Sequence, residues 1–290
     1  MSAERPTVSP DLVAAMIEST PDRVRRRLDR TPDAAASWNW QAGEATWSVE
    51  TGGETVTLPH GHVMGVEQLV QVPKGVSDEQ AAAIMLKGMT TEYLIDHCAK
   101  PWLKKGDIVL FHAAAGGVGL LFGQWAKARG YKAIGTTSSP EKAALAKKNG
   151  YKWVIDYTKE DVVAKVKEIT KGKGVPVVFD GVGKDTWMAS LDSLQPRGLM
   201  CSFGNASGAV APQPPGILNA KGSLYLTRPS LGSYTATRQE LEASAKSLFK
   251  MVKSGKVKIA IDQRYPLAEA AQAHRDLEAR KTTGQTVLVP

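Results

Sequence analysis

The chain has 290 residues, of which 42% are hydrophobic and 23% charged, and this balance excludes a disordered or fibrous protein. No apolar run of about 18 residues occurs, so no transmembrane helix is expected, and the first residues lack the basic start and apolar run of a signal peptide. The two cysteines, Cys98 and Cys201, cannot form a structural four-cysteine zinc site and indicate reduced core thiols in a cytoplasmic protein.

Charge is distributed unevenly along the chain. Residues 1–69 hold six arginines, no lysine and ten acidic residues, a net charge of −4, whereas the rest of the chain carries +12, which gives the total of +8. This change indicates a boundary near Leu69. The positive charge is compatible with anionic ligands such as phosphates, or with nucleic acid. The lysines are scattered over predicted helices, which favours solvated faces over a nucleic-acid surface.

Three Ser/Thr-Pro-Asp triplets recur every eleven residues in the first part, at 9–11, 20–22 and 31–33. Each combines an N-cap hydroxyl, a proline at the first helical position and an acid at the positive helix end. Short helices are therefore predicted to begin near Pro10 and Pro21, while the third signal fades into residues 34–37. The arginine-rich run 23–30 is interpreted as a solvated helix face, with a nucleic-acid contact as the alternative.

A hairpin is predicted over residues 47–58. Trp47 and Val49 alternate with polar residues, the glycine pair 52–53 allows a turn, and a second alternation follows. Residues 47–69 faintly resemble the lead-in to a SWIM-type zinc finger, but the cysteine and histidine ligands of such a finger do not follow. His60 and His62 are interpreted as loop residues, and no metal site is expected.

After Leu69, predicted strands alternate with predicted helices. Ser77 caps a helix that runs through residue 86, and a further helical stretch is expected to open at Gly88 and to cover 91–99. From Gly106 the alternation is typical of a parallel, doubly wound α/β sheet of the Rossmann type. Strands are predicted at 108–112, 132–137, 153–156, 177–180, 198–203 and 223–227, with helices at 117–129, 140–148, 160–170 and 184–194. The tail is predicted as helix 238–254, strand 256–262, helix 267–280 and strand 286–289.

A glycine-rich loop joins the first strand to the first helix. The sequence Ala-Ala-Ala-Gly-Gly-Val-Gly at 113–119 matches G-x-G-x-x-G with Ala114 in the first place, Gly116 in the second and Gly119 in the third. Gly116 lets the backbone approach a pyrophosphate, and Gly119 lets the helix pack on the strand. The helix N-terminus then offers its N–H groups to the phosphates. Because the loop lies between a strand and a helix, it predicts a dinucleotide site.

The end of the second strand indicates which dinucleotide binds. Residues 135–139 are Gly-Thr-Thr-Ser-Ser, without the acidic residue that holds the ribose 2′-hydroxyl in NAD enzymes. Ser138 can donate a hydrogen bond to a 2′-phosphate, and Lys142 brings a positive charge one helical turn later. Tyr157 can lie against the adenine or bond the same phosphate. The pattern therefore predicts NADPH.

Residues 69–290 closely resemble the bacterial NADPH:quinone oxidoreductases, which are zeta-crystallin-like, zinc-less members of the medium-chain dehydrogenase/reductase family. The resemblance rests on DEQAAAIMLKGMTTEYL, HAAAGGVGL, FDGVGKDTW, LMCSFGNASGAV and GSLYLTRPSLGSY. It implies zinc-independent hydride transfer from NADPH to quinones or to activated alkenes and carbonyls. It also implies a homodimer that pairs through the edge strand 223–227. No acid–base triad is evident, so catalytic residues stay unassigned.

The resemblance also implies cofactor contacts at the carboxyl ends of the strands. Gly116, Gly117 and Val118 would bind the pyrophosphate, and Ser138, Lys142 and Tyr157 would bind the 2′-phosphate. Val182 would border the adenosine half, and Gly204 and Asn205 the nicotinamide half. Tyr93 would line the cleft, and Arg280 would reach back to the cofactor. The complete predicted set is Tyr93, Gly116, Gly117, Val118, Ser138, Lys142, Tyr157, Val182, Gly204, Asn205 and Arg280.

The N-terminal part departs from this family. Its members begin with a GroES-like β domain that covers the nicotinamide, and residues 1–69 neither resemble that domain nor suffice to build it. The predicted organisation is an atypical region at 1–69, an NADPH-binding Rossmann domain with leading helices at 70–263, and a C-terminal helix and strand at 264–290 that are left without their usual partner. A fusion or truncation near Leu69 is expected. The alternative function is therefore an NADPH-binding module with impaired catalysis.

Overall fold

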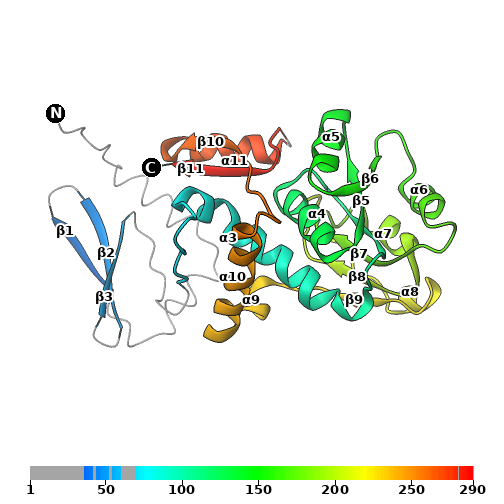
Figure 1. Ribbon diagram of the computed structural model, residues 1–290, viewed down its shortest axis with the longest axis horizontal. Coiled ribbons are helices and arrows are strands. Elements are labelled where there is room, and N and C mark those ends of the chain that lie inside the picture. Colours follow the sequence, from blue (N-terminus) through cyan, green and yellow to red (C-terminus); the bar gives the residue numbers. More distant parts are fainter. Residues whose placement is uncertain (1–35, 42–43, 52–53, 60–68, 280, 290) are drawn as a thin grey trace. The chain divides into compact units, whose positions relative to one another are not determined.

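The computed structural model describes residues 36–41, 44–51, 54–59, 69–279 and 281–289 (Figure 1). By its internal contacts the chain divides into two compact units, Met1–Leu69 and Val70–Pro290, and each is described by itself. The helices expected near Pro10 and Pro21, the arginine run 23–30, and His60 and His62 lie outside the described residues. Among the residues that the structure describes, no helix has the length and apolar character needed to span a membrane.

The first unit contains an antiparallel sheet in the order β1-β2-β3. Its strands are β1 (Ala36–Gln41), β2 (Glu44–Thr51) and β3 (Glu54–Pro59). Strands β2 and β3 pair antiparallel, with Trp47 opposite Leu58 and Thr51 opposite Glu54, so the predicted hairpin pairing is confirmed. Strand β1 extends beyond that prediction, and it pairs Trp38 with Trp47. Its two tryptophans have the high strand propensity that suits such a pairing.

The second unit is built on a six-stranded sheet in the order β6-β5-β4-β7-β8-β9. Every neighbouring pair is parallel. The sheet therefore starts at its centre and winds outward in both directions, which confirms the predicted doubly wound fold. The strands are β4 (Ile108–Phe111), β5 (Lys132–Thr137), β6 (Tyr151–Asp156), β7 (Val175–Asp180), β8 (Leu194–Ser202) and β9 (Tyr225–Thr227).

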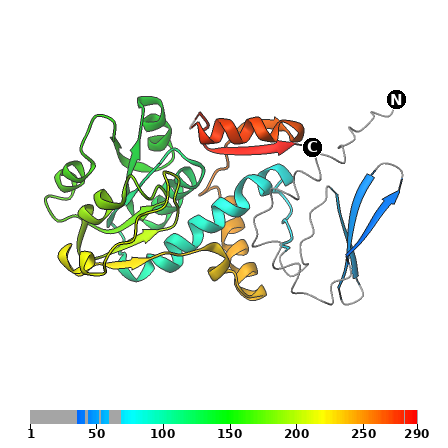
Figure 2. The same cartoon turned by 180° about the vertical axis from the view of Figure 1, so that it is seen from behind.

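Helices cover both faces of this sheet, as the two opposite views show (Figures 1 and 2). Alternate residues of a strand point to opposite faces, so Val109 and Phe111 belong to one hydrophobic cluster and Leu110 to the other. Strands that are apolar on both faces are what a sheet buried on both sides requires. The first cluster includes residues of α4 (Gly117–Arg129) and α5 (Pro140–Lys148), and the second packs against α6 (Val162–Ile169), α7 (Trp187–Ser193) and α8 (Gly216–Ala220).

Helix α3 (Asp78–Tyr93) precedes the sheet and begins as predicted. Ser77 forms a capping box with Gln80, in which each side chain accepts a hydrogen bond from the other residue's backbone N–H. The break expected at Gly88 is wrong, because the helix continues into a π-helical turn at Leu94–Cys98 and then a 3₁₀ turn at Lys100–Trp102. A Cβ at Gly88 would lie 2.6 Å from Leu248 Cδ1 on α10 (Arg238–Lys253). The glycine therefore serves helix packing.

The tail forms a separate two-stranded parallel sheet of β10 (Ile261–Pro266) and β11 (Gln285–Val289), which is connected by the 3₁₀ turn Leu267–Glu269 and by α11 (Ala270–Glu278). The strand predicted at 256–262 is wrong over most of its length. The backbone N–H and C=O of Lys258 bond to the side chain of Gln124 and not to a neighbouring strand. The short helix α9 (Leu231–Tyr234) completes the described elements.

The tail contacts helix α3 and the glycine-rich loop of the same unit. Arg264 forms a bidentate ion pair with Glu79 near the start of α3, with N···O distances of 2.7 and 3.1 Å. The N–H of Gly284 donates to the C=O of Ala115, and the side-chain amide of Gln285 donates to the C=O of Gly117 at 2.8 Å. The start of β11 therefore rests on the glycine-rich loop.

Candidate dinucleotide site

The glycine-rich loop makes a tight turn between β4 and α4. Ala113 adopts a left-handed conformation with φ of 57°, and the N–H of Gly116 donates back to its C=O at 3.0 Å. Gly116 is the N-cap of α4 and has no side chain to occupy the first N–H groups of the helix. A Cβ at Gly119 would lie 2.6 Å from the carbonyl oxygens of Ala113 and Ala114. The loop can therefore present unpaired N–H groups and a positive helix end to an anion.

Two segments that sequence reasoning did not assign to the site surround this loop. The side chain of Lys87 on α3 crosses Gly117 so closely that a Cβ there would lie 2.7 Å from Lys87 Cδ, and the C=O of Gly284 lies on the same glycine. Burial lowers the pKa of Lys87. The signal for both residues is weak in the sequence, because their position depends on how α3 and the tail fold back.

The carboxyl ends of β5 and β6 meet beside the loop. Strand β5 ends at Thr137 and β6 at Asp156, and these two residues pair in the ladder. Ser138 and Tyr157 follow directly, and the N–H of Tyr157 donates to the C=O of Thr137 at 3.1 Å. Tyr157 is 44% exposed, and the hydroxyl of Thr137 is buried without a hydrogen-bond partner among the described residues. This corner thus has an exposed tyrosine ring next to a buried hydroxyl that lacks a partner among the described residues.

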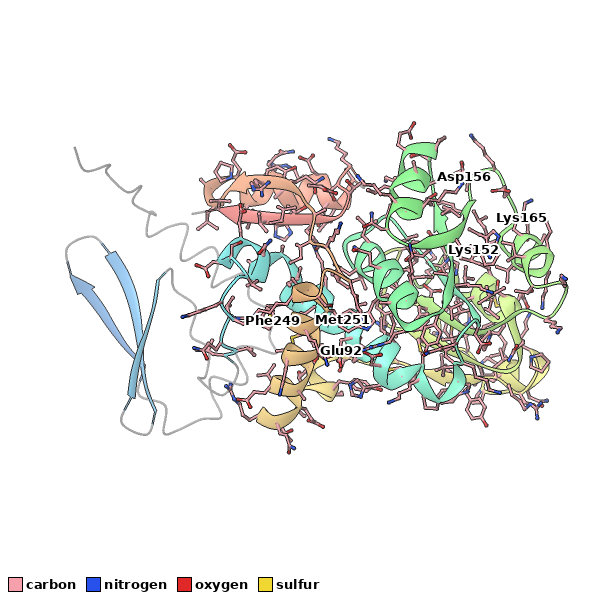
Figure 3. The ribbon with its side chains drawn as sticks, viewed as in Figure 1. Glu92, Lys152, Asp156, Lys165, Phe249 and Met251 are labelled. Carbon is pink, nitrogen blue, oxygen red and sulfur yellow. The ribbon has the colours of Figure 1, made fainter. Side chains whose placement is uncertain are left out.

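The corner also contains carboxylates, among them Asp156 on the neighbouring strand and Glu160, which accepts from the N–H of Asp156 at 3.1 Å. Asp156 (Figure 3) accepts a hydrogen bond of 2.6 Å from the hydroxyl of Thr158 and lies 3.8 Å from the ammonium of Lys159. These contacts, with the Thr158 hydrogen bond first, lower the pKa of Asp156. The partners of the Asp156 carboxylate named here, Thr158 and Lys159, belong to the turn that directly follows it. Lys142 lies in the first turn of α5, where its N–H donates to the Ser139 hydroxyl that caps the helix.

The ends of β7 and β8 form the opposite side of the sheet edge. The N–H of Val182 donates to Asp180 at 2.8 Å, and its C=O accepts from the N–H of Ser207. Gly204 and Asn205 follow β8, and the guanidinium of Arg228, after β9, donates to the C=O of Ser202 at 2.7 Å. An open pocket of about 230 Å³ lies here and is lined by Trp187, Ser202, Asn205, Ala209, Val210, Leu226 and Arg228.

Tyr93 and Arg280 differ from the rest of the predicted set. Tyr93 is the last residue of α3, is only 2% exposed, and stacks on Tyr234 with ring centroids 4.8 Å apart. Burial raises its pKa to about 12. Arg280 lies outside the described residues. The other nine predicted residues lie at or directly after the carboxyl ends of β4, β5, β6, β7 and β8, which is the edge where doubly wound sheets bind ligands.

Both cysteines are buried, as expected for core residues. The Sγ of Cys98 lies 3.0 Å from the Tyr234 hydroxyl. A hydrogen bond with Cys201 and a weaker one with Tyr234 lower the pKa of Cys98 to about 7, whereas burial raises that of Cys201. Among the described residues, no three His, Cys, Asp or Glu side chains gather in a way that could hold a metal ion. Their side chains therefore do not fit a zinc centre.

Comparison with known proteins identifies relatives over most of the chain. A family model for zinc-binding dehydrogenases matches residues 117–250. The chain is 56% identical over 229 residues to a quinone oxidoreductase of Pseudomonas aeruginosa, a match that covers 79% of this chain and 70% of the relative. It is 44% identical over 227 residues to a 2-haloacrylate reductase of Burkholderia, with 77% and 68% covered.

A solved structure gives the same result. The crystal structure of Escherichia coli quinone oxidoreductase complexed with NADPH superimposes with a TM-score of 0.76 and 42% identity, over 92% of this chain and 86% of that one. With identities well above 30% over more than two thirds of these relatives, the chain belongs to the quinone oxidoreductase family of the medium-chain dehydrogenases/reductases.

Proposed function

We propose that this chain is an oxidoreductase that binds NADPH and transfers its hydride to a quinone or an activated alkene. The observation that carries the proposal is the sheet edge itself, where a glycine-rich helix N-terminus and a carboxylate-free end of β5 lie side by side. The relatives named quinone oxidoreductase and 2-haloacrylate reductase support these two acceptor classes. The NADPH complex of a 42% identical structure supports the cofactor.

The residues at the edge suit each part of NADPH. Gly116, Gly117 and Val118 would hold the pyrophosphate through backbone N–H groups, because a helix N-terminus attracts anions. Ser138, Lys142 and Tyr157 would hold the 2′-phosphate. Val182 would border the adenosine half, and Gly204 and Asn205 the nicotinamide half. Arg280 would reach the cofactor from the tail. Tyr93, buried under Tyr234, would support the cleft wall.

The division of labour follows from this set. NADPH supplies the hydride, and the protein binds, orients and shields it. No residue of the described part is assigned as acid or base, and a zinc-independent reaction fits the quinone oxidoreductase family to which the chain belongs. An NADPH-binding module with impaired catalysis is the alternative, because the sequence of residues 1–69 does not resemble a GroES-like domain.

We also propose a cytoplasmic homodimer. Strand β9 lies at the edge of the sheet, and its Tyr225 and Leu226 are 53% and 44% exposed. An exposed apolar edge strand is suited to pairing with a second copy across a two-fold axis.

A steady-state assay tests the function. The full chain is mixed with NADPH and either 1,4-benzoquinone or an acrylate with an electron-withdrawing substituent, and the loss of NADPH absorbance above the protein-free rate is recorded. We expect saturable, protein-dependent oxidation with at least one acceptor class. Binding of NADPH with no oxidation by either acceptor would establish the binding-module alternative, and no binding of NADPH would refute both.

A further inference from the structure

A chain of buried polar side chains runs beneath the loops of the dinucleotide site. It contains Thr136 on β5, His112 after β4, Ser190 on α7 and Asp180 at the end of β7, and each of these residues is at most 2% exposed. Buried polar groups are costly unless they are paired. Sequence reasoning did not join these four residues, because each stands alone beside an apolar stretch.

Successive hydrogen-bond contacts connect these four side chains. Thr136 Oγ1 lies 3.2 Å from His112 Nδ1, and His112 Nε2 lies 3.0 Å from Ser190 Oγ. Ser190 Oγ donates to Asp180 Oδ2 at 2.7 Å. The other oxygen of Asp180 accepts from the N–H groups of Val182 and Gly183 at 2.8 and 3.0 Å.

The positions of the protons follow from these contacts. A serine hydroxyl has one hydrogen, and that of Ser190 is given to Asp180, so Ser190 can only accept from His112 and the imidazole must carry its hydrogen on Nε2. Burial lowers the pKa of His112, which keeps the ring neutral and leaves Nδ1 as an acceptor. The Thr136 hydroxyl then donates to Nδ1. Its lone pairs are left to accept the N–H of Ala113, which lies 3.2 Å away.

The two ends of this chain are the two loops that flank the site. At one end Thr136 holds Ala113, whose left-handed backbone with φ of 57° costs energy for a residue other than glycine and needs support. At the other end Asp180 holds the turn of Val182 and Gly183, and also accepts from the hydroxyl of Thr186 just before α7. One continuous series of hydrogen bonds thus fixes the backbone of the glycine-rich loop and of the loop after β7, at residues 181–183, which is called the β7 loop.

We propose that Thr136 and Ser190 are positioning residues for the dinucleotide, which act through the Nε2–H tautomer of His112 to hold the glycine-rich loop and the β7 loop in register. This inference rests on the proposed function, since it assumes that both loops bind NADPH. It does not require any of the four side chains to touch the cofactor. The direction of every hydrogen bond in the series is fixed, so the loss of one hydroxyl should change the conformation of the loops.

Two matched pairs of variants of the full chain test the proposal. Thr136→Val removes the hydroxyl and keeps the shape, whereas Thr136→Ser keeps the hydroxyl. Ser190→Ala interrupts the hydrogen-bond series. Ser193→Ala removes an equally buried hydroxyl of the same helix, which within the described part of the protein bonds to the C=O of Ala189 and to none of the four residues. NADPH affinity is measured by fluorescence titration well below each unfolding temperature. The tautomer of His112 is read in the wild-type chain from the ¹⁵N chemical shifts of its ring.

We expect NADPH to bind roughly 10-fold more weakly to Thr136→Val and Ser190→Ala. The first leaves the N–H of Ala113 in the loop unsatisfied, and the second leaves the buried Nε2–H of His112 unsatisfied and removes a donor from Asp180. Thr136→Ser and Ser193→Ala should remain within about twofold of wild type, a margin below that of one hydrogen bond. The wild-type ring should show the hydrogen on Nε2. The proposal would be overturned if Thr136→Val bound NADPH as tightly as wild type, or if Ser193→Ala lost as much NADPH affinity as Ser190→Ala. A hydrogen on Nδ1 of His112 would also overturn it. A wild-type chain that does not bind NADPH refutes the proposed function instead, and the tautomer still tests the hydrogen-bond chain.

Discussion

Gly119 and Ala114 are in such close contact that a Cβ on Gly119 would lie 2.6 Å from the carbonyl oxygen of Ala114. This contact brings the first turn of α4 onto the end of β4, and so sets where the N–H groups of the glycine-rich loop point. The site therefore depends on the absence of one side chain as much as on the polar groups around it.

Replacement of Gly119 by alanine should destabilise the fold and weaken NADPH binding together. Overpacking against backbone costs ~1–3 kcal/mol, so thermal unfolding should shift down by several degrees. Gly216→Ala is the matched control, because nothing lies within 4 Å of a Cβ at Gly216. If Gly119→Ala kept the unfolding temperature and the NADPH affinity of wild type, the close contact between Gly119 and Ala114 would be contradicted.

Replacement of Lys142 by alanine should discriminate between the two nicotinamide cofactors. A charge-assisted hydrogen bond contributes ~1.5–3 kcal/mol, so the affinity for NADPH should fall about tenfold or more while that for NADH barely changes. Parallel fluorescence titrations with both cofactors measure this, with Lys148→Ala at the far end of the same helix as the control. A similar loss for NADPH and NADH would remove Lys142 from the 2′-phosphate site.

Acid should destabilise the protein through His112. Burial is the larger effect and lowers its folded pKa below the ordinary value of 6.5, while the charge of Asp180 acts in the opposite direction. The unfolded state therefore binds the proton more readily, and stability is complete above pH 6.5 and is lost as the pH falls from there towards the folded pKa. His112→Asn should unfold at a temperature that depends less on pH over this range, whereas exposed His274→Gln should keep the wild-type slope. Identical slopes in all three proteins would contradict a buried neutral imidazole.

Replacement of Leu226 by glutamate should convert the proposed dimer to a monomer. Leu226 is 44% exposed on the edge strand β9, so a charge there should prevent pairing without disturbing the core. Leu224, which also belongs to the predicted edge segment, is only 7% exposed and packs in a core cluster, so a charge at that position would test folding instead. Light scattering at micromolar concentration measures the masses, and a monomeric wild type would refute the dimer.

The parts of the fold that local patterns determine could be predicted from the sequence. The bounds of α4, β5 and α5 agree with prediction to the residue, because an apolar strand, a proline or glycine at the helix start and a glycine or asparagine after its end all point to the same limits. The failures come from contacts between distant segments. Gly88 reads as a break but packs against Leu248, and Lys258 reads as part of a strand but bonds to Gln124.

The same distinction applies to the candidate site. The glycine-rich loop and Ser138 could be predicted, since each follows directly from the end of a strand. The buried partnership of Thr136, His112 and Asp180 could not, because it depends on which strands become neighbours in the sheet. Lys87 and Gly284 reach the loop only through the folding of α3 and the tail.

Amide hydrogen exchange of the full chain, with and without saturating NADPH, locates the cofactor on the sheet. We expect NADPH to slow exchange at the strand ends, within residues 113–119, 135–142, 181–183 and 203–207, and to leave α8 and the strands β1 to β3 unchanged. Tight NADPH binding with no protection at residues 113–119 and 135–142, or protection confined to the first 69 residues, would contradict it.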